Sequence, residues 1–166
     1  MNADLLIDSP LGMLLLSAEN DALTALRIVD DAPPSATAAT PLLLRARAQL
    51  DEYFGGARTA FDLPLRPRGT PFQQSVWQAL QTVPAGQTIS YARLAQRLGL
   101  SAAHARAVGA AVGRNPLLIL LPCHRIVGHD GGLTGYAAGL PRKRALLEFE
   151  RAARAHKGAV ALRIVA

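Results

Sequence analysis

The stretch "SYARLAQRLGLSAAHARAVGAAVG", Ser90 to Gly113, decides the fold of this chain of 166 residues. Ser90 precedes one helical pattern that closes at Gly99, and Ser101 precedes a second, so two short helices are predicted about three residues apart. This spacing is typical of a helix-turn-helix, although an ordinary pair of antiparallel helices shares it. Basic residues on or beside both helices favour the helix-turn-helix: Arg93, Arg97, Arg106 and Arg114.

The charge distribution favours a polyanionic partner for the same part of the chain. Residues 70–166 hold twelve Lys or Arg against three Asp or Glu, a net charge of +9. Residues 1–69 hold six Arg against nine Asp or Glu, a net charge of −3. A generally basic surface is the plainer explanation, but the contrast between the halves points to a polyanion bound by the C-terminal part.

The chain divides into two predicted domains, 1–68 and 69–166. The first is expected to be a small α+β domain with strands over 4–8, 13–19, 23–29 and 61–65 and a helix from Pro41 to the Gly-Gly pair at 55–56. Half of all residues are apolar, enough for a packed core, and no apolar run has the length of a membrane span. The N-terminus lacks the basic region of a signal peptide, so a cytoplasmic protein is expected.

The second domain is expected to be mainly helical. "TPFQ", Thr70 to Gln73, has the pattern of a capping box with proline at the first helical position. Phe72, Val76, Leu80 and Val83 follow at helical spacing, and Trp77 is predicted to anchor this helix in the core. A last amphipathic helix is predicted over 140–157, and the pattern of the tail 159–166 fits either a strand or an irregular segment.

A possible reactive centre lies in "LPCHRIVG", Leu121 to Gly128, which contains the only cysteine. A free cysteine is most often an inert buried residue, but His124 offers a base and Arg125 a positive charge that favours the thiolate. A third group is needed to orient the imidazole. The acidic candidates in this half are Asp130, Glu148 and Glu150, and the residues alone do not choose among them. One cysteine and four dispersed histidines lack ligand spacing, so no metal site is predicted.

At this point the chain resembles a known family. "PCHRIVG", preceded by "RAVGAAVGRNP" and followed by "LTGYAAGLPRKRALLEFE", is similar to the O6-alkylguanine-DNA alkyltransferases. The similarity is close from Thr70 to about Glu150, whereas the first domain shares only an "SPLG" hairpin, "LDEYFGG" and "FDLPL". The resemblance implies an RNase H-like N-terminal α+β domain, then a helical domain with a helix-turn-helix that binds DNA and accepts an alkyl group.

The resemblance implies DNA repair by direct reversal of damage. A base carrying the alkyl group, O6-alkylguanine with O4-alkylthymine as a further candidate, would be flipped out of duplex DNA that is bound through its minor groove. The alkyl group would pass irreversibly to the protein in one step, so each molecule acts once. No cofactor is needed, and a monomer without membrane contact is expected.

Residue by residue, the resemblance assigns the reaction to five side chains. Cys123 would be the acceptor nucleophile, His124 would deprotonate it through a water, and Glu150 would orient the imidazole. Asn115 would tie the turn before the cysteine into this network. Tyr91 would donate its hydroxyl to the departing guanine.

Two further sets of residues are implied. Arg106 would fill the gap left by the flipped nucleotide, with further DNA contacts from Arg93, Ala107, Arg114 and Arg125. The base pocket would be formed by Tyr91, Ile126, Gly135, Tyr136, Ala137, Ala138 and Lys143. Where relatives have a small polar residue and paired glycines, this chain has Ala137 and Ala138, and the methyl group of Ala138 is expected to narrow the pocket.

Two other classes of function remain open from the sequence. One is a non-catalytic binder of damaged DNA. Relatives of that kind replace the acceptor cysteine, whereas this chain retains it, so this class ranks below repair. The other is a Cys–His hydrolase unrelated to DNA, which would need an oxyanion hole and would leave the basic half and the helix pair unexplained.

Overall fold

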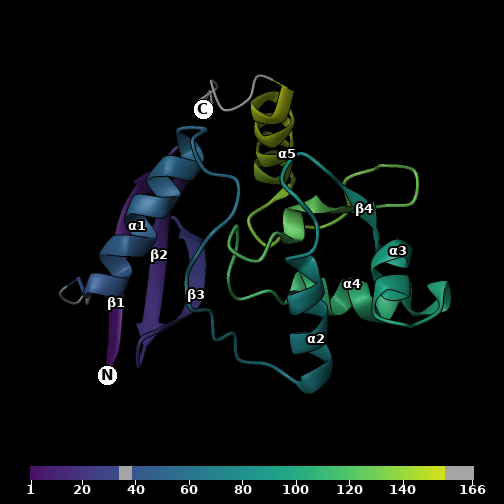
Figure 1. Ribbon diagram of the computed structural model, residues 1–166, viewed down its shortest axis with the longest axis horizontal. Coiled ribbons are helices and arrows are strands. Elements are labelled where there is room, and N and C mark those ends of the chain that lie inside the picture. The colour runs from purple at the N-terminus through teal and green to yellow at the C-terminus, as the bar shows by residue number, and fades with distance from the viewer. Residues whose placement is uncertain (34–38, 156–166) are drawn as a thin grey trace.

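The computed structural model describes residues 1–33 and 39–155 and has one half built on a sheet and one built on helices (Figure 1). The strands β1 (Asn2–Ser9), β2 (Gly12–Glu19) and β3 (Ala22–Val29) form an antiparallel sheet in the order β1-β2-β3. The helix α1 (Pro41–Phe54) packs on β1 and β2. The three predicted strands and the helix are therefore confirmed, and "SPLG" turns the chain between β1 and β2, with Gly12 at φ +112°.

The prediction of a strand over 61–65 is wrong, because this segment has no regular secondary structure. Both backbone groups of Asp62 are occupied by the side chain of Gln49: Asp62 N donates to Gln49 Oε1 at 2.9 Å, and Gln49 Nε2 donates to Asp62 O at 3.1 Å. Pro64 has no amide hydrogen to add to a ladder. The segment therefore makes only one isolated bridge, between Leu65 and Leu23 of β3.

The second half consists mainly of helices, as predicted. Its helices are α2 (Pro71–Leu80), α3 (Tyr91–Arg97), α4 (Ala105–Gly113) and α5 (Leu140–Ala155). Two short turns of 3₁₀ helix, η1 (Ala102–His104) and η2 (Cys123–Arg125), and a two-stranded parallel pair, β4 (Ile89–Ser90) with β5 (Ile126–Val127), complete it. The tail 159–166 lies outside the described residues. Within those residues, no helix is both long and apolar enough to cross a membrane.

The helix pair α3 and α4 forms the predicted helix-turn-helix, with one local correction. Ser90 caps α3 by accepting a hydrogen bond from Arg93 N at 3.1 Å. Ser101 does not cap a helix in the same way, because its hydroxyl contacts His104 Nδ1 at 3.1 Å. The first turn after Ser101 is therefore the 3₁₀ turn η1, and α4 begins at Ala105.

Helix α2 is fixed at its start and at its centre. Thr70 and Gln73 form the predicted capping box, each side chain accepting from the backbone N–H of the other. Trp77 is 1% exposed and donates from Nε1 to Ala111 O of α4 at 2.8 Å. Phe72, expected on the core face, is instead 39% exposed. The indole hydrogen bond holds α2 against the helix-turn-helix.

The two halves share a core and meet just before the cysteine. The backbone of Leu26 in β3 accepts from Leu118 N at 3.2 Å and donates to Pro116 O at 2.9 Å. Arg142 of α5 donates from Nε to Leu11 O, in the turn between β1 and β2, at 2.9 Å. Buried residues of both halves belong to one hydrophobic cluster. The predicted domain boundary between residues 68 and 69 stays a proposal. The hydrogen bonds of Leu26 show that the sheet directly supports the segment that leads to Cys123.

The capping box gives a first test of this architecture. Replacing Thr70 with Ala removes one acceptor and should lower the free energy of unfolding by about 1 kcal/mol. Thr70→Ser keeps the oxygen and should stay close to the wild type. Urea unfolding of the three proteins measures the difference, and equal losses in both variants would contradict a role for the hydroxyl.

Candidate active site

The turn before Cys123 is clamped by one buried amide. Asn115 Nδ2 donates to Leu121 O at 2.7 Å, and Asn115 Oδ1 accepts from Leu117 N at 2.9 Å. Between these contacts Ile119 has φ +71°, which is unfavourable for a β-branched residue. Such a conformation persists only where its surroundings enforce it, so this turn has one fixed shape. Asn115 therefore ties the turn together, and its predicted link to the reactive residues stays a proposal.

Cys123 follows this turn and borders a cavity of about 280 Å³. The residue is only 5% exposed. Burial raises the pKa of the Cys123 thiol to about 11, while a hydrogen bond from Asn115 and the charge of Lys143 act in the opposite direction. Because thiolate is the reactive form, this thiol needs a base at the moment of reaction.

The neighbouring histidine makes a buried contact with α5. His124 Nε2 lies 2.7 Å from Glu150 Oε1, and the two side chains are 0% and 1% exposed. Burial by itself raises the pKa of Glu150, but the His124 contact and the Arg125 guanidinium outweigh it and hold this pKa well below the usual range. The ionised carboxylate only accepts, so Nε2 carries the imidazole hydrogen. Nδ1, which has no hydrogen-bond partner within 1–33 and 39–155, keeps its lone pair to take a proton.

Arg125, which was predicted to contact DNA, lies in the interior of the protein. It is 6% exposed and binds Glu150 through two nitrogens, Nε to Oε2 at 2.9 Å and Nη2 to Oε1 at 2.8 Å. Its third nitrogen, Nη1, donates to Val83 O at 2.7 Å. A buried carboxylate needs a charged partner, and the adjacent guanidinium supplies it. Arg125 is therefore committed to the interior.

The loop across the cavity is held by two side chains that meet at one carbonyl. Tyr91 OH donates to Thr134 O at 2.9 Å, and Lys143 Nζ donates to the same oxygen at 3.3 Å. Lys143 Nζ also donates to Ile126 O at 2.6 Å and to Gly135 O at 3.2 Å. Its three hydrogens thus have three acceptors, which lets an ammonium group be fully buried. Burial lowers the pKa of Lys143, and the neighbouring Cys123 opposes this shift.

The structure brings together part of the predicted base pocket. Tyr91, Gly135, Tyr136 and Ala137 line the cavity with Cys123 and Asn115. Ile126, Ala138 and Lys143 do not line it. Ile126 is buried in β5, Lys143 acts from behind the loop, and the carbonyl of Ala138 accepts from Arg142 Nη1 at 3.2 Å. Of the two alanines, Ala137 lines this cavity and Ala138 does not, so the cavity lining gives no support to the predicted narrowing by the methyl group of Ala138.

Sequence reasoning missed the opposite wall and one polar contact. Gly109, Val112 and Gly113 of α4 line the cavity, together with Leu118. Their spacing of three and four residues places the first three on one helix face, and this spacing is the sequence signal that identifies them. The missed polar contact comes from Tyr53 of α1, whose hydroxyl donates to Glu150 Oε1 at 2.7 Å. No sequence signal connects these two residues, because 97 positions separate them.

The other predicted DNA contacts are available to a partner. Arg93, Arg106, Ala107 and Arg114 are exposed, and they lie in α3, in α4 or at the C-cap of α4. Their placement on the helix-turn-helix leaves these residues free to contact a partner. In the part of the chain that the structure describes, no group of three or more His, Cys, Asp or Glu is arranged to hold a metal ion.

Two family models match most of the chain. Residues 71–152 match the model described as 6-O-methylguanine DNA methyltransferase, DNA binding domain. Residues 5–67 match the model described as 6-O-methylguanine DNA methyltransferase, ribonuclease-like domain. The predicted fold class, an RNase H-like α+β domain followed by a mainly helical one, is confirmed.

Curated relatives and solved structures agree with these matches. A methylated-DNA–protein-cysteine methyltransferase of Mycobacterium tuberculosis is 50% identical over 149 residues, covering 87% of this chain and 90% of the relative. The constitutive one of Bacillus subtilis is 42% identical over 160 residues, covering 91% and 96%. The crystal structure of Mycobacterium tuberculosis O6-methylguanine methyltransferase matches with a TM-score of 0.83 and 46% identity, over 92% of this chain and 94% of that one. A structure described as Mycobacterium tuberculosis OGT in complex with DNA matches with a TM-score of 0.81 and 46% identity, over 89% and 92%.

The buried carboxylate makes stability depend on pH in a defined direction. Because the pKa of Glu150 is lowered by folding, its contribution is present above the unfolded value of about 4.3 and is lost as the pH falls below it. Glu150→Gln should lower the free energy of unfolding at pH 7 by about 3 kcal/mol, because the charge of Arg125 stays buried without its partner. Between pH 5 and pH 2 the variant should also lose less of its free energy of unfolding than the wild type. The difference should correspond to the pKa shift of Glu150, which the variant lacks.

Urea unfolding across this range measures both effects. Glu148→Gln is the matched control, since Glu148 is exposed on the same helix. The control should follow the wild type at every pH, and a Glu150→Gln curve parallel to the wild type would contradict the assignment of the acid-sensitive carboxylate.

Proposed function

The chain belongs to the 6-O-methylguanine DNA methyltransferase family, and from this premise we propose that it repairs O6-alkylguanine by moving the alkyl group irreversibly to Cys123. The family activity, transfer of a methyl group from methylated DNA to a protein cysteine, is its activity, and DNA is its partner. The observation that carries the assignment to Cys123 is its place at the cavity beside the buried His124–Glu150 pair.

The first step forms the nucleophile. At neutral pH the Cys123 thiol holds its proton, since its pKa is about 11. We assign the proton to His124 Nδ1, which it reaches through a water, and the resulting imidazolium is stabilised by Glu150 at 2.7 Å. Asn115 and the Lys143 ammonium stabilise the thiolate, because both favour its charged form. The ion pair therefore forms inside a site already arranged for it.

The second step is a displacement at the alkyl carbon. The Sγ–C bond forms as the C–O6 bond breaks, and the electron pair of that bond moves onto the purine. Tyr91 supplies a proton to the departing base, which would otherwise leave as an anion, and the proton that His124 took from the thiol returns through solvent to restore the Tyr91 hydroxyl. Since the Tyr91 hydroxyl donates to Thr134 O in the free protein, a bound guanine must take over this hydrogen bond. The product is a thioether with no leaving group, so each molecule reacts once and no cofactor takes part.

Access of the base to the cavity requires base flipping. The alkylated atom lies inside the duplex, and extruding a nucleotide costs a few kcal/mol. We propose that Arg106, exposed on α4, enters the gap, and that Arg93, Ala107 and Arg114 contact the DNA around it. Docking through the minor groove suits an enzyme that searches for damage in any sequence, because minor-groove readout is degenerate. A cytoplasmic monomer and activity on O4-alkylthymine belong to the same proposal.

Single-turnover transfer tests the assignment of Cys123. A duplex with one labelled O6-methylguanine should transfer one methyl group per protein, and the peptide containing Cys123 should gain the mass of a methylene. Cys123→Ala should bind the duplex without gaining label. Repeated turnover, or label on another residue, would contradict a single-use acceptor.

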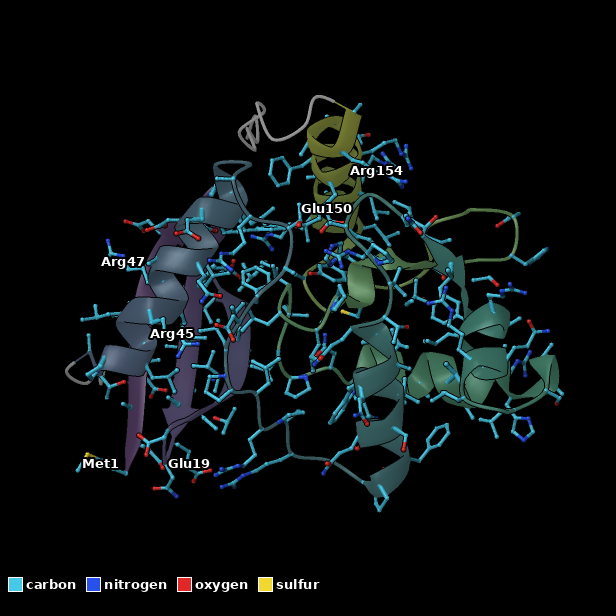
Figure 2. The ribbon with its side chains drawn as sticks, in the orientation of Figure 1. Met1, Glu19, Arg45, Arg47, Glu150 and Arg154 are labelled. Carbon is cyan, nitrogen blue, oxygen red and sulfur yellow. The ribbon has the colours of Figure 1, made fainter. Side chains whose placement is uncertain are left out.

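The proposed role of Arg106 separates two substrates. Arg106→Ala should slow repair of a duplex by about tenfold or more, equivalent to ~1.4 kcal/mol of the cost of flipping, because nothing then fills the gap. Reaction with free O6-methylguanine, which needs no flipping, should remain within about twofold of the wild type. Arg47→Ala, on the distant helix α1 (Figure 2), is the matched control and should alter neither rate. Equal losses on both substrates would remove the base-flipping role.

A further inference from the structure

Glu150 Oε1 is contacted by more donors than it has lone pairs. It accepts from Tyr53 OH at 2.7 Å, from His124 Nε2 at 2.7 Å and from Arg125 Nη2 at 2.8 Å. Oε2 accepts from Arg125 Nε at 2.9 Å and from Gly86 N at 3.4 Å. A carboxylate oxygen has about two lone-pair sites, so three strong donors must share Oε1. Tyr53 and His124 therefore compete for the same negative charge.

Tyr53 presents its hydroxyl to this oxygen from a fixed position. The side chain is 1% exposed and is the contribution of α1 to a site that otherwise belongs to the second half. Its ring is surrounded by Phe54, Phe61 and Phe149, with centroids 5.3, 5.4 and 5.5 Å away. Figure 2 shows Glu150 on α5, in the upper middle of the view. The aromatic packing leaves the hydroxyl little freedom to turn to another acceptor.

Holding the carboxylate in place does not require Tyr53. Arg125 already binds both oxygens, and such a two-point contact fixes the plane and the charge of a carboxylate. What the phenol adds is a neutral donor on the oxygen that faces the imidazole. Burial raises the pKa of Tyr53 and the nearby Glu150 raises it further, so the phenol remains protonated and donating. A hydrogen bond to the charged form stabilises the carboxylate and weakens its pull on other donors.

We propose that Tyr53 is a positioning residue of the alkyl transfer, which acts through Glu150 to limit how strongly the carboxylate draws the N–H of His124. The proposal rests on the proposed function and adds a residue of the first domain to its machinery. If the role of the Tyr53 hydroxyl were purely structural, its hydrogen bond would stabilise the fold and its removal would leave the proton uptake of His124 unchanged. Removing the hydroxyl should let Glu150 Oε1 draw the His124 N–H more strongly.

Several other charged and titratable groups surround Glu150 and also act on its carboxylate. His124 and Arg125 face it from η2, and its charge contributes to the raised pKa of Tyr136, which lines the cavity beside Cys123. The loop at Gly86 contributes a backbone N–H. Behind the carboxylate lies a cavity of about 380 Å³, bordered by Tyr53 and Glu150 with Arg58 and the exposed Arg154. Substitution at Tyr53 leaves all of these side chains in place.

The test is the pH dependence of single-turnover methyl transfer to the full-length protein. In Tyr53→Phe, the acid limb of the rate profile should move to higher pH by about 0.5 units, because Oε1 then serves one fewer donor. Replacing Tyr53 with 3-fluorotyrosine keeps the ring and the hydroxyl but makes the phenol a stronger donor, so the limb should move to lower pH. The two shifts have opposite signs, which a loss of packing cannot produce.

The matched control is Phe61→Leu, which loosens the packing of the Tyr53 ring without touching Glu150. It should lower the unfolding temperature and leave the acid limb where it is in the wild type. If Tyr53→Phe does not fold, the 3-fluorotyrosine protein by itself tests the inference. An acid limb that is unchanged from the wild type, or that moves to higher pH, then overturns it. If the wild type transfers no label, the proposed function itself is wrong. If it transfers label and the profiles of both Tyr53 variants overlie it, only the role of Tyr53 is lost.

Discussion

The buried carboxylate of Glu150 is the interaction on which the rest of the structure depends. It accepts hydrogen bonds from α1, from η2 and from the loop at Gly86, and so joins segments from both halves of the chain to α5. Taking this charge out of water is costly and is offset only because Arg125 lies against both oxygens. The same contacts fix the imidazole of His124, which precedes Arg125 and follows the proposed acceptor Cys123 in the chain. Stability and reactivity are thereby linked through one side chain.

The sequence predicted local structure well and long-range contacts poorly. The capping box at Thr70 and the three strands follow from short patterns, and the spacing of Cys123, His124 and Glu150 follows from the family resemblance. The burial of Arg125 was missed because an arginine beside a reactive cysteine can either contact DNA or pair with a buried carboxylate. Only the fold decides between these two roles. Tyr53 was missed because nothing near it in the sequence indicates a partner 97 residues away. Asp62 was placed in a strand because local patterns do not reveal that the side chain of Gln49 occupies its backbone.

The acceptor thiol occupies a site that is rigid and unfavourable to its own ionisation. Asn115 and the left-handed conformation of Ile119 give the preceding turn a single shape, and the cysteine at its end is only 5% exposed. An exposed low-pKa cysteine would react with many electrophiles, whereas a buried protonated one waits for a ligand that brings the reacting atoms together. If Cys123 is the single-use acceptor that we propose, this restraint protects it until the right substrate is bound.

Trp77 gives the protein an intrinsic spectroscopic reporter of one half only. It is the sole tryptophan in the sequence, it is buried, and its indole is hydrogen-bonded to α4, whereas the sheet half has none. Indole emission thus follows the packing of α2 against the helix-turn-helix, while the strand signal in circular dichroism follows β1 to β3. Coincident transitions by the two probes would mean that the shared core melts as one cooperative unit, and separated transitions would resolve the halves without any label.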